Sequence, residues 1–389
     1  MPENKMKTPY YLFDGSCFHN RIISIREILE DIPLTFSIKA NPFLLSVLPG
    51  GEMISHVEVC SPGELMICRE LSVPGKRILY SGVMKEEWDI REALKYGVDI
   101  ITAESRLHYD LICRVSRETG KNPKVLLRLT SGNQFGMSED DIMGILKGRD
   151  SDPGEVIGIH FYSGTAKARV RQIEKDLLKI RGLLERAEKD AHFTPSLIEY
   201  GPGLSAEYYE APYDDKDREL LDSISDLLKG FRRDYPLGVE MGRYMAAPAG
   251  TYHTRVCDIK SNGGVNYVIV DGGVHQLKYY GQNMAMKIPP VEVLRNGELV
   301  KASEGETNKY CICGSLCTVA DVLIREVELP VLKEGDILSF DRCGAYSVSE
   351  GALTFLSRTM PEIWIRDGEV RCLRERTESW KLNCASKGH

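Results

Sequence analysis

Short apolar runs alternate with amphipathic segments of helical length over the first two thirds of the chain. A run at 10–14 is followed by a helical pattern of apolar positions from Ile22 to Leu29. Beyond it, aliphatic and β-branched runs predict eight strands at 34–38, 57–59, 77–80, 98–102, 124–129, 156–162, 196–200 and 237–241. Segments such as 63–71, 86–96 and 170–187 lie between them and predict helices. Eight such units predict a parallel, closed (β/α)8 barrel.

The alternation of strand and helix patterns ends near residue 249. Short strand patterns separated by Gly, Asn, Pro and Lys-Glu turns follow at 254–259, 266–271, 298–300, 324–329, 336–340 and 369–373. Few helical segments separate them, so this part predicts an antiparallel β domain, either a β-barrel or a sandwich. The pattern alone leaves open whether the strand at 10–14 belongs to it.

Composition narrows the class of protein. The 389 residues are 42% hydrophobic and 28% charged, which fits a globular chain of about two domains. A net charge of −7 argues against nucleic acid or an anionic membrane as partner, and no apolar run is long enough for a bilayer. The eleven cysteines are irregularly spaced and no signal peptide opens the chain, so free thiols in the cytoplasm are expected. Cys311, Cys313 and Cys317 lack a matching Cys/His pair, so no metal site is predicted.

Lys39 is the first candidate for chemistry. It follows the strand at 34–38, and Asn41-Pro42 then begins a turn. Desolvation at the carboxyl end of a buried strand favours the neutral amine, which is the form that makes a Schiff base with an aldehyde such as pyridoxal 5′-phosphate (PLP). The alternative is a solvated surface lysine, and only the context of the other strand ends distinguishes the two.

The other strand ends supply that context, because active sites of such barrels gather at the carboxyl ends of the strands. Glycines let backbone N–H groups approach a phosphate, and an arginine supplies charge. Taken singly, a glycine-rich segment can be an ordinary turn, a histidine can lie in the core, and a glutamate can lie on the surface. Their coincidence at one barrel mouth favours a cofactor site. The residues are His160, Tyr162 and Thr165 after the sixth strand, Gly201 and Gly203 after the seventh, and Glu240, Gly242 and Arg243 after the eighth.

Three motifs make a resemblance specific: Ser-Ile-Lys-Ala-Asn at 37–41, Glu-Met-Gly-Arg at 240–243 and Cys-Gly-Ser-Leu-Cys-Thr-Val-Ala-Asp at 313–321. Val-Glu-Val-Cys-Ser-Pro-Gly-Glu, Gln-Phe-Gly-Met, Val-Asp-Gly-Gly and Gly-Ala-Tyr extend it. Together they resemble the fold-type III PLP-dependent decarboxylases, the diaminopimelate/ornithine decarboxylase family. The resemblance implies an alanine racemase-like fold, with the barrel at 33–248 and a β domain of 1–32 plus 249–389. It also implies a head-to-tail homodimer with shared active sites.

The same resemblance implies roles for individual residues. Lys39 would bind PLP covalently, and Glu240 would pair with the pyridine nitrogen. Cys317 would reach the active site of the other subunit and direct protonation of the substrate carbon. The cofactor would also contact His160, and its phosphate would lie against Thr165, Gly201, Gly203, Gly242, Arg243 and Tyr346.

Departures from the family pattern point to the substrate. Tyr162 stands where the family has a histidine stacked on the cofactor, and Gln134 replaces an interface lysine. Thr318 stands where diamine-forming members carry an acid. This resembles the branch in siderophore, antibiotic and carrier-linked pathways. We therefore expect a non-standard or conjugated amino acid, carried on a scaffold or carrier protein in some members, with Thr318 and Asp321 near the substrate.

Three alternatives to that activity remain at this stage. A diaminopimelate, ornithine or lysine decarboxylase requires another acid, such as Asp321 or Glu350, to bind the distal amine. A racemase of this fold places an arginine, and not Glu240, against the pyridine nitrogen. A non-catalytic regulatory homologue tends to lose the cofactor residues that this chain retains.

Overall fold

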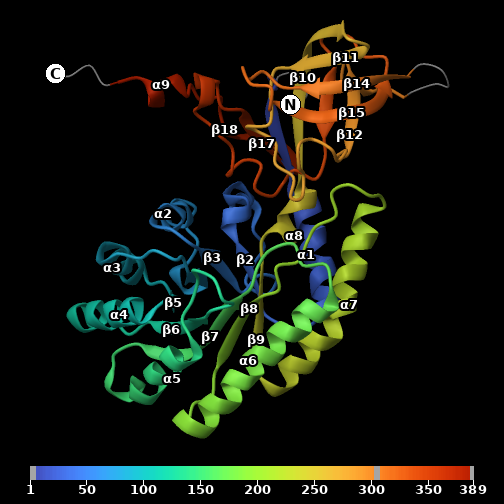
Figure 1. Ribbon diagram of the computed structural model, residues 1–389. Helices are drawn as coiled ribbons and strands as arrows, with labels where there is room; N and C mark the ends of the chain where they lie inside the picture. Colours follow the sequence, from blue (N-terminus) through green and yellow to red (C-terminus); the bar gives the residue numbers. More distant parts are fainter. Residues whose placement is uncertain (1–5, 302–306, 386–389) are drawn as a thin grey trace. The chain divides into compact units, whose positions relative to one another are not determined.

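The computed structural model describes residues 6–301 and 307–385, and these divide into two compact units (Figure 1). The barrel unit comprises Arg21–Ala206 and Asp215–Tyr244. The sheet unit comprises the chain up to Asn20, Glu207–Asp214 and the chain from Met245 onward. Compared with the expected boundaries, residues 21–32 fall with the barrel, and Glu207–Asp214 and residues 245–248 fall with the sheet.

The barrel unit is a closed ring of parallel strands with helices outside it (Figure 1). Its strands are β2 (Leu34–Ser37), β3 (His56–Val59), β4 (Ile78–Tyr80), β5 (Ile100–Ala103), β6 (Lys124–Leu129), β7 (Glu155–Tyr162), β8 (Leu197–Gly201) and β9 (Leu237–Met241). Its helices are α1 (Gly15–Leu29, shared with the sheet unit), α2 (Pro62–Glu70), α3 (Glu87–Tyr96), α4 (Arg106–Thr119), α5 (Glu139–Gly148), α6 (Val170–Ala191), α7 (Tyr213–Asp234) and α8 (Arg243–Ala246). The predicted barrel is thereby confirmed, with strand ends shifted by no more than a few residues.

Local sequence explains how these elements begin and pack. Ser61, Ser105 and Ser138 each precede a helix, and each side chain accepts a backbone N–H three residues on. The strands are aliphatic because the barrel buries both faces. Leu79, Ile100, Leu126 and Ile157 form one such buried cluster across β4 to β7.

Closure of the barrel places β2 between β3 and β9. Ser37 lies opposite Glu58 on β3, and Thr35 lies opposite Glu240 on β9. Two glutamates separated by 182 residues in sequence (240 − 58) therefore flank the strand that ends just before Lys39.

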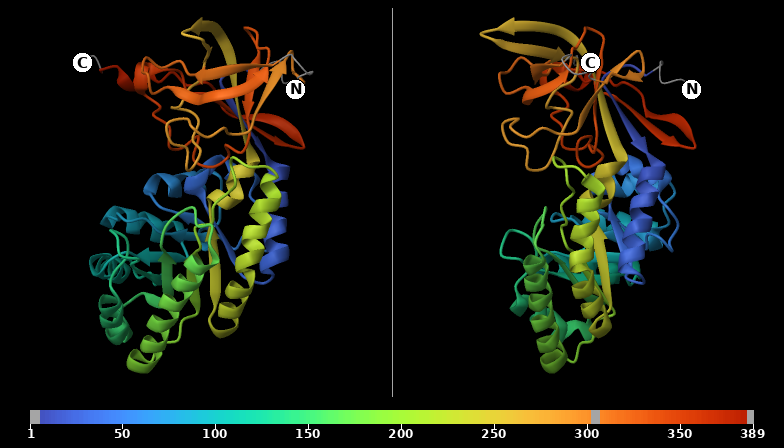
Figure 2. Two further views of the ribbon diagram at one scale, coloured as in Figure 1. Left: turned by 45° about the vertical axis from the view of Figure 1, so that its right-hand side comes forward. Right: turned by 90° about the vertical axis from the view of Figure 1, so that its right-hand side faces the viewer.

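The sheet unit contains a ten-stranded sheet. Its strands are β1 (Tyr10–Asp14), β10 (Gly250–Asn262), β11 (Val265–Val270), β12 (Val291–Arg295), β13 (Glu298–Leu299), β14 (Thr307–Cys313), β15 (Val322–Pro330), β16 (Ile337–Phe340), β17 (Glu362–Asp367) and β18 (Glu369–Arg374). The N-terminal β1 pairs with β10 and β17, as Figure 2 shows where the blue strand lies beside red ones. Most pairings are antiparallel as predicted, but β1 with β17 and β11 with β14 are parallel, so the sheet is mixed.

Two further expectations concern membranes and thiols. Among the described residues, none of the helices combines the length and apolar character that crossing a bilayer requires. All eleven cysteines lie within the described ranges and are free thiols.

Candidate active site

Lys39 sits in a short turn that fixes its backbone and leaves its amine accessible. The turn Ile38–Ala40 follows β2 directly, and both of its flanking side chains are fully buried. The Asn41 side chain then accepts the N–H of Phe43 at 3.1 Å and starts the next turn, Pro42–Val47. The Lys39 side chain is 41% exposed. A reagent entering the barrel mouth can therefore reach an amine whose backbone is already ordered.

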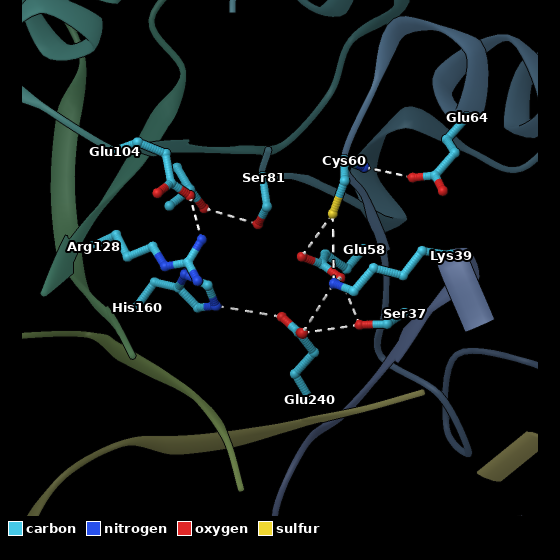
Figure 3. A network of polar contacts seen from close by, with 11 residues as sticks. Ser37, Lys39, Glu58, Cys60, Glu64, Ser81, Glu104, Arg128, His160 and Glu240 are labelled. Atoms are coloured by element: carbon cyan, nitrogen blue, oxygen red, sulfur yellow. Dashed lines mark hydrogen bonds and ion pairs between the residues drawn. The ribbon is translucent and has the colours of Figure 1, made fainter. Parts of the chain in front are cut away.

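Three groups from neighbouring strands surround the Lys39 amine (Figure 3). Lys39 Nζ donates to Glu58 Oε2 at 2.5 Å and lies 3.8 Å from Glu240 Oε1. The Cys60 sulfur lies 3.5 Å from the same nitrogen. Both carboxylates are almost fully buried, so they act on the lysine through a medium that screens charge poorly.

Glu240 is held as a carboxylate. Burial by itself would raise its pKa, but Lys39, the nearby His160 and the hydrogen bond from Ser37 outweigh burial and hold the pKa well below its usual range. Ser37 Oγ donates to Oε1 at 2.8 Å, and His160 Nε2 lies 3.4 Å from Oε2. A buried, ionised carboxylate of this kind stabilises a protonated ring nitrogen.

A second ion pair lies across the same barrel mouth. Arg128 Nη1 donates to Glu104 Oε1 at 2.5 Å, and Glu104 Oε2 accepts the N–H of Gly136 at 3.1 Å. Gly136 has φ +72°, and a Cβ there would lie 2.8 Å from the Arg128 carbonyl oxygen, so the turn requires glycine. The Gln-Phe-Gly-Met motif is thus fastened to the barrel by the Arg128–Glu104 pair.

Glycines form a cradle after β8 and β9. A Cβ at Gly201 would lie 2.7 Å from the Tyr162 ring, and a Cβ at Gly203 would lie 1.9 Å from the carbonyl oxygen of Gly164. A Cβ at Gly242 would meet the Ala40 and Ser37 side chains at the longer distances of 3.1 and 3.2 Å. Backbone N–H groups in such tight, side-chain-free turns suit an anionic group. The cradle, the accessible Lys39 amine and the ionised Glu240 together match the phosphate, aldehyde and ring nitrogen of PLP, so the residues present fit that cofactor.

Tyr162 and the loop after β7 complete the barrel side of the site. Burial raises the pKa of Tyr162, partly offset by a hydrogen bond with Thr165, so its hydroxyl stays neutral. Ser163 donates to Asp176 at 2.8 Å, and Asp176 also pairs with the buried Lys167. This buried pair anchors the loop that carries Thr165. Arg243 follows Gly242 directly and opens α8.

The remaining predicted residues lie in loops of the sheet unit. Cys317 and Thr318 are exposed at the tip of the loop between β14 and β15. Asp321, at the base of that loop, is 3% exposed, and its two oxygens accept the N–H groups of Val274 and Leu316 at 2.8 and 2.6 Å. Asp321 therefore shapes the loop; its contact with substrate stays a prediction. Tyr346 is half-buried and has φ +67°, a left-handed conformation that is unusual for tyrosine and is found in functional turns.

Sequence reasoning gave no role to Glu58 or Ser37. A signal for Glu58 was present, because a glutamate in the middle of the apolar run Val57-Glu58-Val59 is rarely buried without a partner. Ser37 carried no such signal. Its position depends on which strands meet when the barrel closes.

Comparison with known proteins shows the family and the fold of this chain. The sequence family described as "Pyridoxal-dependent decarboxylase, C-terminal sheet domain" matches residues 11–344. A diaminopimelate decarboxylase from Aquifex aeolicus is 24% identical, with 95% of this chain and 89% of the relative covered. The diaminopimelate decarboxylase of Helicobacter pylori, solved with L-lysine, has the same fold, with a TM-score of 0.83 at 21% identity and 98% of each chain covered.

Two further relatives act on conjugated substrates by name. L-glutamyl-[BtrI acyl-carrier protein] decarboxylase from Niallia circulans is 27% identical, with 96% of this chain and 92% of the relative covered. A 2-[(L-alanin-3-ylcarbamoyl)methyl]-2-hydroxybutanedioate decarboxylase from Staphylococcus aureus is 26% identical, with coverage of 91% and 92%.

Proposed function

The chain belongs to the pyridoxal-dependent decarboxylase family, and from that membership we propose that it decarboxylates a conjugated or otherwise non-standard amino acid. Its general activity is that of a PLP-dependent amino acid decarboxylase, a carboxy-lyase. The finer proposal concerns what lies at the far end of the substrate, beyond the α-carbon.

The barrel residues have distinct tasks in this activity. PLP, when bound, supplies a ring that accepts the electrons left behind as CO2 departs. Lys39 would hold the cofactor covalently, and Glu240 would keep its ring nitrogen protonated. The cradle of Gly201, Gly203 and Gly242, with Arg243, would hold the phosphate. Tyr162 offers a neutral aromatic face where relatives have a titratable histidine.

The substrate proposal rests on the presence of a threonine at position 318. A distal ammonium group loses its hydration on binding, and a charge-assisted hydrogen bond of about 1.5–3 kcal/mol would offset part of that loss. Threonine offers only a hydroxyl and a methyl group. The nearest acid in its loop, Asp321, has both oxygens committed to backbone N–H groups. A far end that is neutral, amide-linked or carried on a scaffold fits this loop better than a free amine. The two relatives that act on conjugated substrates support the same choice.

The experiment is a matched screen for CO2 release. Free diamino acids, free glutamate and amide-conjugated or carrier-bound amino acids are offered to the PLP-loaded enzyme, and the amine product is identified by mass. We expect kcat/KM for the best conjugate to exceed that for lysine, ornithine and diaminopimelate by at least about 100-fold. A free diamino acid with kcat/KM above about 10⁴ M⁻¹s⁻¹ would contradict the proposal, since that is the range of well-matched substrates.

A gain-of-function variant sharpens the test. Thr318→Glu restores an acid at the loop tip and is expected to improve kcat/KM for diamino acids by about tenfold, which corresponds to roughly 1.4 kcal/mol. Ser315→Ala, in the same loop, adds no charge and serves as the matched control. If Thr318→Glu leaves diamino acid turnover at the control level, Thr318 is not the specificity position.

We further propose that two copies of the chain share their active sites. The loop tip from Cys317 to Ala320 is exposed throughout, and Val319 is 99% exposed. An exposed loop tip that carries a predicted catalytic cysteine needs a second surface to enclose a substrate, because small-molecule sites are concave. The family resemblance assigns that surface to the barrel mouth of a second copy.

A further inference from the structure

Ser37 links two carboxylates that would otherwise act separately. Its hydroxyl contacts Glu58 Oε2 and also Glu240 Oε1, the latter at 2.8 Å (Figure 3). A hydroxyl carries one proton, so it can donate to only one of the two oxygens at a time. All three side chains are at most 6% exposed, so bulk water does not take over the missing donation.

Of the two glutamates, Glu58 lies closer to the Lys39 amine and accepts its hydrogen bond. The Lys39 nitrogen is 2.5 Å from Glu58 Oε2, against 3.8 Å from Glu240 Oε1. The other oxygen of Glu58 accepts the Cys60 thiol at 3.1 Å. Burial and the Glu58 charge raise the pKa of Cys60 well above its usual value, so the thiol keeps its proton and remains a donor.

We propose that Glu58 is a further catalytic residue: it takes a proton from the Lys39 ammonium so that the neutral amine can bind the cofactor, and Ser37 transmits the change to Glu240. The proton moves from Lys39 Nζ to Glu58 Oε2, leaving a neutral amine and a neutral carboxylic acid, and no other bond changes. The neutral amine is the form that forms a covalent bond with an aldehyde. The inference rests on PLP as the cofactor and is independent of the proposed substrate.

The arrangement favours Glu58 over Glu240 as the acceptor. Glu240 lies beside His160, and Lys39, His160 and Ser37 together hold its carboxylate ionised. A neutral Glu58 accepts a weaker hydrogen bond from Ser37 than the carboxylate does. The Ser37 hydroxyl then donates its proton to Glu240. The Glu240 carboxylate, which would pair with the ring nitrogen of a bound cofactor, is thereby better stabilised. In this scheme Glu58 touches the reacting nitrogen, whereas Ser37 is a positioning residue.

The test follows attachment of PLP to the full-length apoprotein at pH 7 by visible absorbance. Glu58→Gln keeps the shape but cannot accept a proton, so attachment is expected to slow by about 100-fold, the scale of general base catalysis. Non-covalent affinity, measured with 4-deoxypyridoxine 5′-phosphate, which has no aldehyde, should change by less than about twofold. Glu64→Gln is the matched control, because Glu64 is a nearby acid that accepts the Cys60 N–H and whose influence on Lys39 is Coulombic.

A different role for Glu58 predicts the opposite result. A Glu58 that acts only as a counter-ion would stabilise the ammonium, and Glu58→Gln would then attach PLP as fast as the wild type or faster. That result overturns the proposal. Should the Gln variant fail to fold, Glu58→Asp gives the answer: it keeps the charge but withdraws the oxygen by one methylene. We expect at least about tenfold slower attachment for Asp, and an unchanged rate would also overturn the proposal.

Ser37→Ala tests the second half of the inference. Attachment should stay within about threefold of wild type, while the visible spectrum of the bound cofactor changes and kcat falls with KM unchanged. An unaltered spectrum and kcat would show that Ser37 does not transmit the charge of Glu58 to Glu240.

Discussion

At the scale of single residues, the site depends on glutamates buried in the middle of barrel strands. Glu58, Glu199 and Glu240 each interrupt an apolar strand, yet their surroundings differ. Glu240 is stabilised as an anion by Lys39, His160 and Ser37, whereas burial and the charge of Glu240 raise the pKa of Glu199 to about 8. One carboxyl group is therefore charged and the other neutral within the same barrel.

Glu240→Gln should retain PLP but lose most activity. The amide has no charge to offer a protonated ring nitrogen, and loss of a principal electrostatic group costs about 3–4 kcal/mol, or a few hundredfold in kcat. Steady-state kinetics of the PLP-loaded variant measure this. A kcat within about threefold of wild type, roughly 0.7 kcal/mol, would mean that Glu240 is not the group paired with the ring.

Glu199 should make the protein less stable as pH rises. Its pKa is raised in the folded state, so its contribution to stability is full below about pH 4.5 and is lost as pH rises toward about 8. In that window the wild type should lose up to about 1.4 kcal/mol of unfolding free energy per pH unit relative to Glu199→Gln. Denaturant unfolding of both proteins between pH 5 and 8 gives the comparison. Parallel curves would show that Glu199 ionises normally in the fold.

At the scale of secondary-structure elements, the sequence predicted the strands that are buried on both faces and missed several others. All eight barrel strands were found because aliphatic runs alternate with helices. β12, β14 and β17 were missed, because they are half-exposed and contain polar residues, and because β17 owes its place to pairing with β1 at the other end of the chain. The cradle glycines were found for a related reason: Gly-Pro-Gly directly after a predicted strand indicates a tight turn at the carboxyl end of that strand, where the barrel mouth lies.

The tight turn after β8 gives a prediction at this scale. Gly203→Ala places a Cβ 1.9 Å from the Gly164 carbonyl oxygen at φ +61°, so the two loops must separate. We expect the apoprotein to bind PLP at least about tenfold more weakly, roughly 1.4 kcal/mol. Gly182→Ala in the middle of α6 meets nothing within 4 Å and should be neutral or slightly stabilising. Fluorescence titration with PLP measures both, and equal affinities would show that the cradle does not hold the phosphate.

At the scale of the whole molecule, the site could be predicted only in part. Lys39, Glu240 and the glycines carry motifs, but the contact of Ser37 with both Glu58 and Glu240 exists only because the barrel closes β2 onto β9. No local sequence pattern predicts which side chains become neighbours when the first and last strands of the barrel pair. The residues of the sheet unit have a similar status, since Cys317 and Thr318 face solvent in the single chain and the role proposed for them requires a second copy.

A complementation experiment tests the shared site. Lys39→Ala and Cys317→Ala homodimers should each be inactive, because one lacks the covalent attachment point and the other the predicted proton donor. Mixed and allowed to exchange subunits, they should regain about a quarter of wild-type activity: half of the dimers are mixed, and each has one intact site of two. Failure to recover activity when exchange is complete would place Lys39 and Cys317 in the same chain's site.

Asp321 has a consequence for how such a dimer would assemble. Its two oxygens accept one backbone N–H from within the loop that carries Cys317, at Leu316, and one from the segment after β11, at Val274, so the loop is ordered before any second copy arrives. A flexible loop would lose conformational entropy on association, about 1–2 kcal/mol for each backbone residue that becomes fixed. Here that entropy is already lost when the chain folds. The buried carboxylate thus lets most of the contact energy at the loop tip appear as affinity between subunits.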